Sequence, residues 1–162
     1  MINLQPINQD NGYDILRLKA DPTYVAANVD SMAEAYLYHM SKGHFPLVWG
    51  IYNDATPVGF AMVDYCEQSA GDTIDNQFQN YYYLWRFMID ENHQRKGYGL
   101  DAIKLIIEQV KTMPMGESNA LYTSVDPRAG NPIPFYEKLG FEKTGEVYPP
   151  EDDSEEVMRL VF

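Results

Sequence analysis

The chain has 162 residues, of which 45% are hydrophobic and 22% charged, and its formal net charge is −12. This size and composition fit one globular domain, and no apolar run approaches the roughly 20 residues that span a bilayer. With 24 acidic and 12 basic side chains, the chain is a poor match for nucleic acid and would attract a cationic substrate, although acidity that serves only solubility is the plainer reading.

The spacing of apolar and turn-forming residues predicts an alternation of strands and helices. In chain order we expect a strand (2–7), two helices (13–19 and 31–40), three strands (47–52, 57–66 and 81–89), a helix (100–110), a strand (120–125), a helix (131–139) and two strands (141–147 and 157–162). Polar segments at 67–80 and 149–156 are predicted to be loops.

This order predicts a single domain over residues 1–162 of mixed α+β class. We expect a mostly antiparallel sheet of six or seven strands flanked by about four helices. A parallel pair is expected where the strands 81–89 and 120–125 are joined by a helix. The helix over 31–40 is predicted to begin at Ser31 as N-cap, because Glu34 follows at capping-box spacing.

The N-terminus and the cysteine content bear on where the chain works. Met1–Pro6 lacks the basic start and apolar core of a signal peptide. Cys66 is the only cysteine, which excludes an intrachain disulfide, and we expect an inert buried thiol. These observations predict a cytoplasmic protein with no membrane partner. No group of His, Cys and carboxylate residues has metal-ligand spacing, so no metal site is predicted.

The segment Gln94-Arg95-Lys96-Gly97-Tyr98-Gly99 lies between the strand 81–89 and the helix 100–110. Glycines allow a backbone to approach an anion, and the N–H groups and dipole at a helix N-terminus attract negative charge. Two cations lie in this loop of an otherwise acidic chain. The arrangement predicts a phosphate-binding loop. The dinucleotide pattern G-x-G-x-x-A also fits residues 97–102, but residues 90–96 separate its first glycine from the strand, which disfavours that reading.

Two blocks, residues 84–99 and 131–141, together resemble the GCN5-related N-acetyltransferase (GNAT) family. The first carries the family's Q/R-x-x-G-x-G/A loop, and the second is similar to its N-x-x-A-x-x-L-Y-x-x-x-G-F element in a shortened form. The resemblance covers most of the chain. It implies the GNAT fold, with a central parallel pair that splays to admit the pantetheine, and acetyl-CoA as co-substrate.

The resemblance also implies roles for individual residues. The backbone of Phe87, Met88 and Ile89 would pair with the pantetheine amides and polarise the acetyl carbonyl, and residues 94–99 would bind the pyrophosphate. Asn131 would hydrogen-bond the pantetheine, and Tyr136 would protonate the leaving thiolate. A phenol suits that task because its ordinary pKa is near that of a thiol. Pro134 stands where the family often has alanine, which leaves the local helix geometry open.

The base and the acceptor are less determined. Residues 24–35 and 84–90 are similar to the bacterial spermine/spermidine acetyltransferases of this family, which implies a polyamine acceptor. However, Trp85 and Arg86 stand where such enzymes often carry acidic residues. Glu34, Tyr83 and Trp85 are candidates for contact with a cationic amine, and Asp64 is another. Each has a structural alternative: a helix cap for Glu34, packing for the aromatic residues and an exposed strand position for Asp64.

We therefore expect an acetyl-CoA-dependent N-acetyltransferase in which a primary amine attacks the thioester directly and Tyr136 acts as general acid. The expected acceptor is a small cationic amine, with spermine or spermidine first. Two alternatives stay open. One is transfer to another amine, such as an antibiotic, an amino acid or a protein N-terminus, and the other is a non-catalytic sensor that binds acetyl-CoA. A homodimer is also expected.

Overall fold

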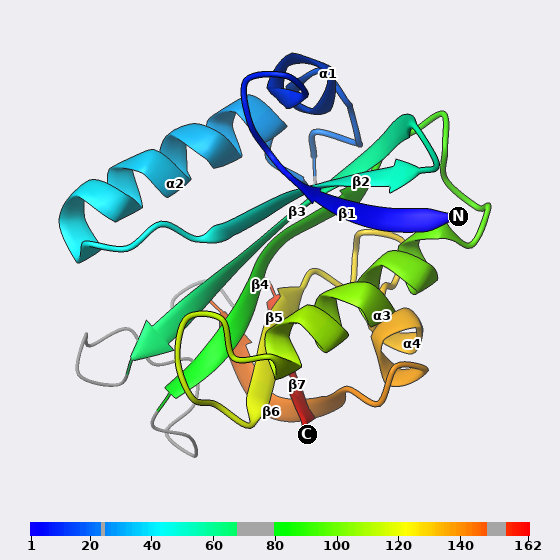
Figure 1. Cartoon of the computed structure of the whole chain (residues 1–162). Helices are drawn as coiled ribbons and strands as arrows, with labels where there is room; N and C mark the ends of the chain where they lie inside the picture. The colour runs from blue at the N-terminus through cyan, green and yellow to red at the C-terminus, as the bar shows by residue number, and fades with distance from the viewer. Residues whose placement is uncertain (24, 68–79, 149–154) are drawn as a thin grey trace. The chain divides into compact units, whose positions relative to one another are not determined.

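The computed structural model describes residues 1–23, 25–67, 80–148 and 155–162. Over these residues it has seven strands and four helices, which confirms the predicted mixed α+β class (Figure 1). In chain order the elements are β1 (Ile2–Pro6), α1 (Gly12–Leu16), α2 (Asn28–Lys42), β2 (Leu47–Asn53), β3 (Thr56–Glu67), β4 (Asn80–Ile89), α3 (Tyr98–Lys111), β5 (Ala120–Val125), α4 (Ile133–Glu137), β6 (Glu142–Tyr148) and β7 (Glu155–Val161). The strand order in the sheet is β1-β2-β3-β4-β5-β7-β6.

Packing divides the chain into two compact units. The first unit comprises residues 1–64 and 86–106, and the second comprises residues 65–85 and 107–162. The chain passes from one unit to the other within β3, β4 and α3.

The first unit is built on an antiparallel meander. β1 pairs with β2, with Leu4 opposite Ile51, and β2 pairs with β3, with Gly50 opposite Phe60. Ile51 and Phe60 are fully buried and lie on opposite faces of the hairpin, so the strands of this unit bury side chains on both faces. The helix α2 runs across β2 and β3 on one face of the sheet (Figure 1).

The start of α2 differs from the prediction. The helix begins at Asn28, and its N-cap residue Ala27 makes no side-chain cap bond. Ser31 therefore lies inside the helix, fully buried, and the predicted capping box with Glu34 is wrong. The helix extends toward the N-terminus because Asn28 is held in place: its side-chain amide donates to the carbonyl oxygen of Ile15 at 2.9 Å, at the end of α1.

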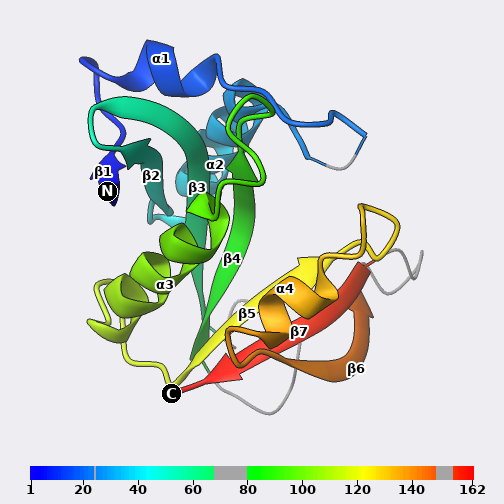
Figure 2. The ribbon, with the colours of Figure 1, turned by 90° about the vertical axis from the view of Figure 1, so that its right-hand side faces the viewer.

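The second unit contains the predicted parallel pair. β4 and β5 pair in parallel at Tyr82–Leu121 and Tyr83–Tyr122, and β7 is antiparallel to both β5 and β6. The short helix α4 lies over β5 and β7 (Figure 2). On one face of these strands a buried cluster forms around Tyr81, Ala120, Tyr122 and Val157. The rings of Tyr81 and Tyr122 pack with their centroids 4.8 Å apart, which explains the aromatic character of the segment 81–83.

Element boundaries differ from the predictions by a few residues. The helix α4 begins at Ile133 rather than 131 because Asn131 has a left-handed backbone with φ of 53°. The predicted loops 67–80 and 149–156 lie mostly outside the described residues, and their described ends belong to β3, β4 and β7.

Asp90 holds the end of β4 within the first unit. One carboxylate oxygen accepts the backbone N–H of Lys19 at 2.9 Å, and the other accepts the backbone and side-chain N–H groups of Asn92 at 3.0 and 3.1 Å. Its own N–H donates to the carbonyl of Val58 in β3 at 2.9 Å. Burial would raise the pKa of Asp90, but these hydrogen bonds outweigh it and hold the pKa below the ordinary value.

Replacing Asp90 by asparagine should lower the free energy of unfolding by about 1.5–3 kcal/mol at pH 7, the range for hydrogen bonds to a charged group. Because the folded pKa is depressed, this contribution is complete above the ordinary aspartate value of about 4 and is lost as the pH falls through the folded value. Urea unfolding of the wild-type chain and the variant at pH 7 and pH 3 measures the loss of stability and its dependence on pH. Asp10→Asn, an exposed position, removes the same charge and should change little. An equal loss for both variants at pH 7 would contradict the anchoring role.

Candidate active site

The loop between β4 and α3 has a backbone shape fixed by its own residues. Gly97 has a φ of 83° and Arg95 a φ of 60°, both in the left-handed region. The side chain of Gln94 donates to the carbonyl oxygen of Ile89 at 3.0 Å, and the ammonium of Lys96 donates to that of Asn92 at 3.0 Å. The first bond ties the loop to the end of β4, and the second closes a turn within the loop.

The loop ends at the N-terminus of α3. The N–H groups of Leu100 and Asp101 both donate to the carbonyl oxygen of Gly97, at 3.1 and 3.3 Å. Tyr98 and Gly99 supply first-turn N–H groups that have no partner within the helix. A Cβ atom added at Gly97 would meet nothing within 4 Å, so the space beside this backbone is open. N–H groups, a helix dipole and two exposed cations in one place suit an anion such as a pyrophosphate.

The end of β4 presents its backbone in two directions. The carbonyl oxygen of Met88 lies beside Gly59 of β3, where an added Cβ would come within 2.4 Å of it. Asp90 also bonds to β3 through its N–H group. Because backbone groups alternate along a strand, those of Phe87 and Ile89 point away from β3. These two residues, rather than Met88, have backbone groups directed toward the other edge of β4.

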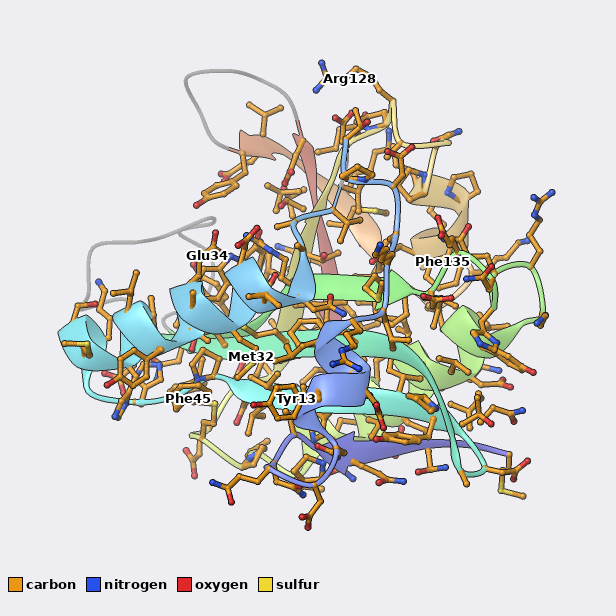
Figure 3. The ribbon with its side chains drawn as sticks, turned by 90° about the horizontal axis from the view of Figure 1, so that it is seen from above. Tyr13, Met32, Glu34, Phe45, Arg128 and Phe135 are labelled. Atoms are coloured by element: carbon orange, nitrogen blue, oxygen red, sulfur yellow. The ribbon has the colours of Figure 1, made fainter. Side chains whose placement is uncertain are left out.

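Glu34 and Arg86 form an ion pair inside the first unit. A terminal nitrogen of Arg86 on β4 donates to the Glu34 carboxylate on α2 at 2.7 Å. Figure 3 shows Glu34 on α2. The Glu34 side chain is 44% exposed and that of Arg86 is 24% exposed. Arg86 stands where the related polyamine acetyltransferases often carry an acidic residue. In this structure the carboxylate near that position comes from Glu34 on α2 and binds Arg86.

Asp64 was predicted to be exposed, and the structure contradicts this. Its side chain is 3% exposed, and its carboxylate accepts a hydrogen bond from the ring Nε2 of His44 at 3.0 Å. The His44 ring also packs edge-on against Tyr38. This pair joins the segment after α2 to β3, which explains how a carboxylate is accommodated in the interior.

Tyr136 is a buried phenol in the second unit. Its ring packs edge-on between Phe135 and Phe141, with ring centroids 5.1 and 5.4 Å away. Burial raises the pKa of Tyr136 to about 12, against the opposing effect of a hydrogen bond with Thr123 of β5. The phenol is therefore neutral at pH 7 and holds its proton for donation.

The other predicted residues of the second unit are placed as follows. Asn131 is exposed in the turn before α4, where its N–H donates to the carbonyl of Pro127 at 3.1 Å. Trp85 is half-buried on β4. Tyr83, also half-buried on β4, shares a hydrogen bond of 2.7 Å with the hydroxyl of Ser124 on β5. The residues of the loop, the end of β4 and Glu34 belong to the first unit, whereas these residues and Tyr136 belong to the second.

Sequence reasoning missed several residues that organise these regions. Asp90 anchors the loop, and its position directly after an apolar strand was the available signal. Ser124 and Glu155 are hydrogen-bonded to each other and, through Ser124, to Tyr83. Nothing in the spacing of those residues could reveal that β4, β5 and β7 bring them together.

The structure offers no support for a metal site or a membrane span in the residues it describes. Over these residues, no group of three or more His, Cys, Asp or Glu side chains could hold a metal ion. None of the helices in the described ranges has the length and apolar character that would carry it across a bilayer.

Comparison with known proteins places the chain among acetyltransferases. Residues 13–141 match the model of the acetyltransferase (GNAT) family. The spermine/spermidine N(1)-acetyltransferase of Bacillus subtilis (strain 168) is 28% identical over 149 residues, which cover 90% of this chain and 91% of the relative.

Solved structures show the same fold. The ribosomal-protein-alanine N-acetyltransferase of Brucella melitensis superposes with a TM-score of 0.69 at 12% identity, over 99% of both chains. The PaiA N-acetyltransferase of Thermoplasma acidophilum, in complex with coenzyme A, superposes with a TM-score of 0.66 at 14% identity, over 100% of this chain and 99% of that one. The family match spans most of the chain and agrees with the fold, so this protein belongs to the acetyltransferase (GNAT) family.

Proposed function

We propose that this acetyltransferase uses acetyl-CoA to acetylate a primary amine of a small cationic acceptor, with spermine and spermidine as the leading candidates. The observation that carries the proposal is the loop over residues 94–99, which joins the end of β4 to the N-terminus of α3. Its left-handed backbone, first-turn N–H groups and two cations fit the pyrophosphate of acetyl-CoA. The backbone groups of Phe87 and Ile89 would receive the pantetheine amides and the acetyl carbonyl.

Tyr136 is the proposed general acid. The amine attacks the thioester carbonyl, the tetrahedral intermediate collapses, and the sulfur leaves as a thiolate that takes the phenolic proton. The raised pKa of Tyr136 keeps this proton in place until the thiolate forms. Burial disfavours every anion, so a thiolate formed in the same surroundings is a stronger base than it is in water. Asn131 is proposed to bind the pantetheine.

The acceptor is inferred from three observations that point to a cation. The formal net charge is −12, a curated relative is named for spermine and spermidine, and Glu34 presents a half-exposed carboxylate. Arg86 binds one carboxylate oxygen of Glu34 and leaves the other to bind an ammonium group. In the second unit, Tyr83 and Trp85 are proposed as aromatic contacts for a cationic amine.

Free-thiol release from acetyl-CoA tests the acceptor with a panel of spermine, spermidine, putrescine, lysine, an aminoglycoside and a short peptide. We expect saturable release with spermine and spermidine and little with the peptide. The rate should fall as the salt concentration rises, because the attraction between the acidic chain and a polycation is screened. Release with a different amine alone would refute the polyamine acceptor. Tight binding of acetyl-CoA without release for any amine would point to a sensor.

Replacing Tyr136 by phenylalanine should lower kcat by about 100-fold or more, the lower range for loss of a general acid. The affinity for acetyl-CoA should change little, since the ring and its packing remain. The control is Tyr13→Phe, because the Tyr13 side chain is 77% exposed and should leave both quantities unchanged. An unchanged kcat for Tyr136→Phe, at equal acetyl-CoA affinity, would exclude the proposed acid.

We also propose that the chain works as a single domain and forms a homodimer. The family match crosses both units. One face of α2 exposes four apolar side chains, Val29, Tyr36, Leu37 and Met40. Its first turn carries Asp30 and its last turn carries Lys42. Two copies of α2 packed antiparallel would bury the apolar face and set each acidic end against a basic end.

Light scattering should give twice the 18.6 kDa mass of the chain. Leu37→Glu should shift the protein to the monomer, whereas Met113→Glu, at an exposed position outside α2, should leave the dimer intact. A dimer that survives Leu37→Glu would exclude this interface, and a monomeric wild-type chain would exclude the dimer.

A further inference from the structure

Three side chains of the second unit form a hydrogen-bonded chain that ends on a carboxylate. The hydroxyl of Tyr83 on β4 lies 2.7 Å from the hydroxyl of Ser124 on β5. The hydroxyl of Ser124 donates in turn to a carboxylate oxygen of Glu155 at the start of β7. The ring of Tyr148 on β6 packs edge-on against Tyr83, with the ring centroids 6.4 Å apart. Residues from four strands therefore position this series of hydrogen-bonded side chains.

The donors and acceptors fix the direction in which each hydrogen bond from Tyr83 to Ser124 to Glu155 is donated. A serine hydroxyl has one proton, and Ser124 donates it to Glu155. Ser124 must then accept the phenolic proton of Tyr83. Any further hydrogen bond at the Tyr83 oxygen is consequently one that it accepts. An ammonium group, which only donates, matches this oxygen, whereas a carboxylate, which only accepts, does not.

The hydrogen-bonded residues Tyr83, Ser124 and Glu155 are placed relative to Tyr136 in a way that suits acetyl transfer. Thr123 and Ser124 are neighbours on β5, so their side chains point to opposite faces of the strand. Thr123 is hydrogen-bonded with Tyr136, and Ser124 is hydrogen-bonded to Tyr83 and Glu155. A proton donor thus lies on one face of β5 and a chain that can accept a proton lies on the other. Acyl transfer to an amine needs both, for the sulfur and for the nitrogen respectively.

We propose that Tyr83, Ser124 and Glu155 carry the first proton away from the acceptor ammonium, an inference that rests on the proposed function. The ammonium proton passes to the Tyr83 oxygen, the phenolic proton to Ser124 and the serine proton to Glu155, which becomes neutral. The freed nitrogen lone pair forms the bond to the acetyl carbon, and the carbon–sulfur bond breaks when the resulting tetrahedral intermediate collapses. After attack the nitrogen loses its second proton to solvent, the thiolate takes the phenolic proton of Tyr136, and solvent returns a proton to Tyr136. Tyr83 is then the residue that takes the proton from the acceptor, and Ser124 and Glu155 are positioning and proton-accepting residues behind it.

Several other ionisable groups share this face of the sheet. They are Cys66 on β3, Tyr81 on β4, Tyr122 on β5, Tyr148 and Glu142 on β6, and Arg159 on β7. Of these, only a cysteine has an ordinary pKa, about 8.5, that lies between pH 7 and the value of about 10 at which phenols ionise. The variant Cys66→Ser removes the thiol, so that any change of rate with pH that remains does not come from Cys66.

The test is the pH dependence of kcat/KM for Glu155→Gln and Tyr83→Phe, with spermidine or with the panel amine that the wild-type chain acetylates fastest. Glutamine can still accept the Ser124 hydrogen bond, so the strands stay tied, but it does not take up the proton. We expect a loss of about 100-fold or more at pH 7 for both variants. The loss should shrink toward pH 10, where the unprotonated amine becomes abundant in solution. The affinity for acetyl-CoA should be unchanged.

The controls decide between a relay and a structural link. Tyr148→Phe keeps the ring against Tyr83 and should follow the wild-type profile, as should Cys66→Ser. Wild-type rates for Glu155→Gln at pH 7 would overturn the relay and leave the proposed function intact. A loss that is the same at pH 7 and pH 10 would also overturn it, since that is the signature of a structural defect. No thiol release by the wild-type chain with any amine, despite acetyl-CoA binding, would overturn the proposed function and the relay with it.

Discussion

The first unit depends on the buried carboxylate of Asp90. It accepts three N–H groups from Lys19 and Asn92, and its own N–H ties the chain to β3. A charged group in the interior is tolerated only with such compensation, and the compensation fixes the backbone on either side of it. The preceding residues of β4 are held against Gly59 and Val58, and the following residues enter the loop at a set angle. Together with the bond from Gln94 to the carbonyl of Ile89, this anchor fixes the loop that leads from the end of β4 to the N-terminus of α3.

The second unit has a corresponding element in β5. Because side chains alternate along a strand, Thr123 reaches the buried phenol of Tyr136 while Ser124 reaches Tyr83 and Glu155. The two faces differ in character. The phenol of Tyr136 is surrounded by aromatic rings and is kept neutral, whereas the chain through Ser124 ends on a charged carboxylate. One strand thus separates a group suited to giving a proton from a chain suited to taking one.

Local patterns predicted the elements well, since apolar alternation marked the strands and the glycines and cations of residues 94–99 marked the loop. The start of α2 was mispredicted because Ser31 and Glu34 match a capping box locally, while the true start is set by Asn28, which bonds to a residue thirteen positions earlier. Asp64 was assigned to the surface because its partner His44 lies in a different element. The pair of Glu34 and Arg86 and the chain of Tyr83, Ser124 and Glu155 likewise join residues distant in sequence. Such contacts follow from strand order and register, which no local pattern encodes.

The most direct test of the central claim, that the loop anchored by Asp90 binds the pyrophosphate of acetyl-CoA, is a calorimetric comparison of acetyl-CoA with S-acetylpantetheine, which lacks the nucleotide and its phosphates. The account predicts that acetyl-CoA binds at least about 100-fold more tightly, a difference of about 2.7 kcal/mol. Replacing both Arg95 and Lys96 by alanine should remove much of that difference, and should affect the affinity for S-acetylpantetheine little. Equal affinities of the wild-type chain for the two ligands would contradict the assignment of the loop.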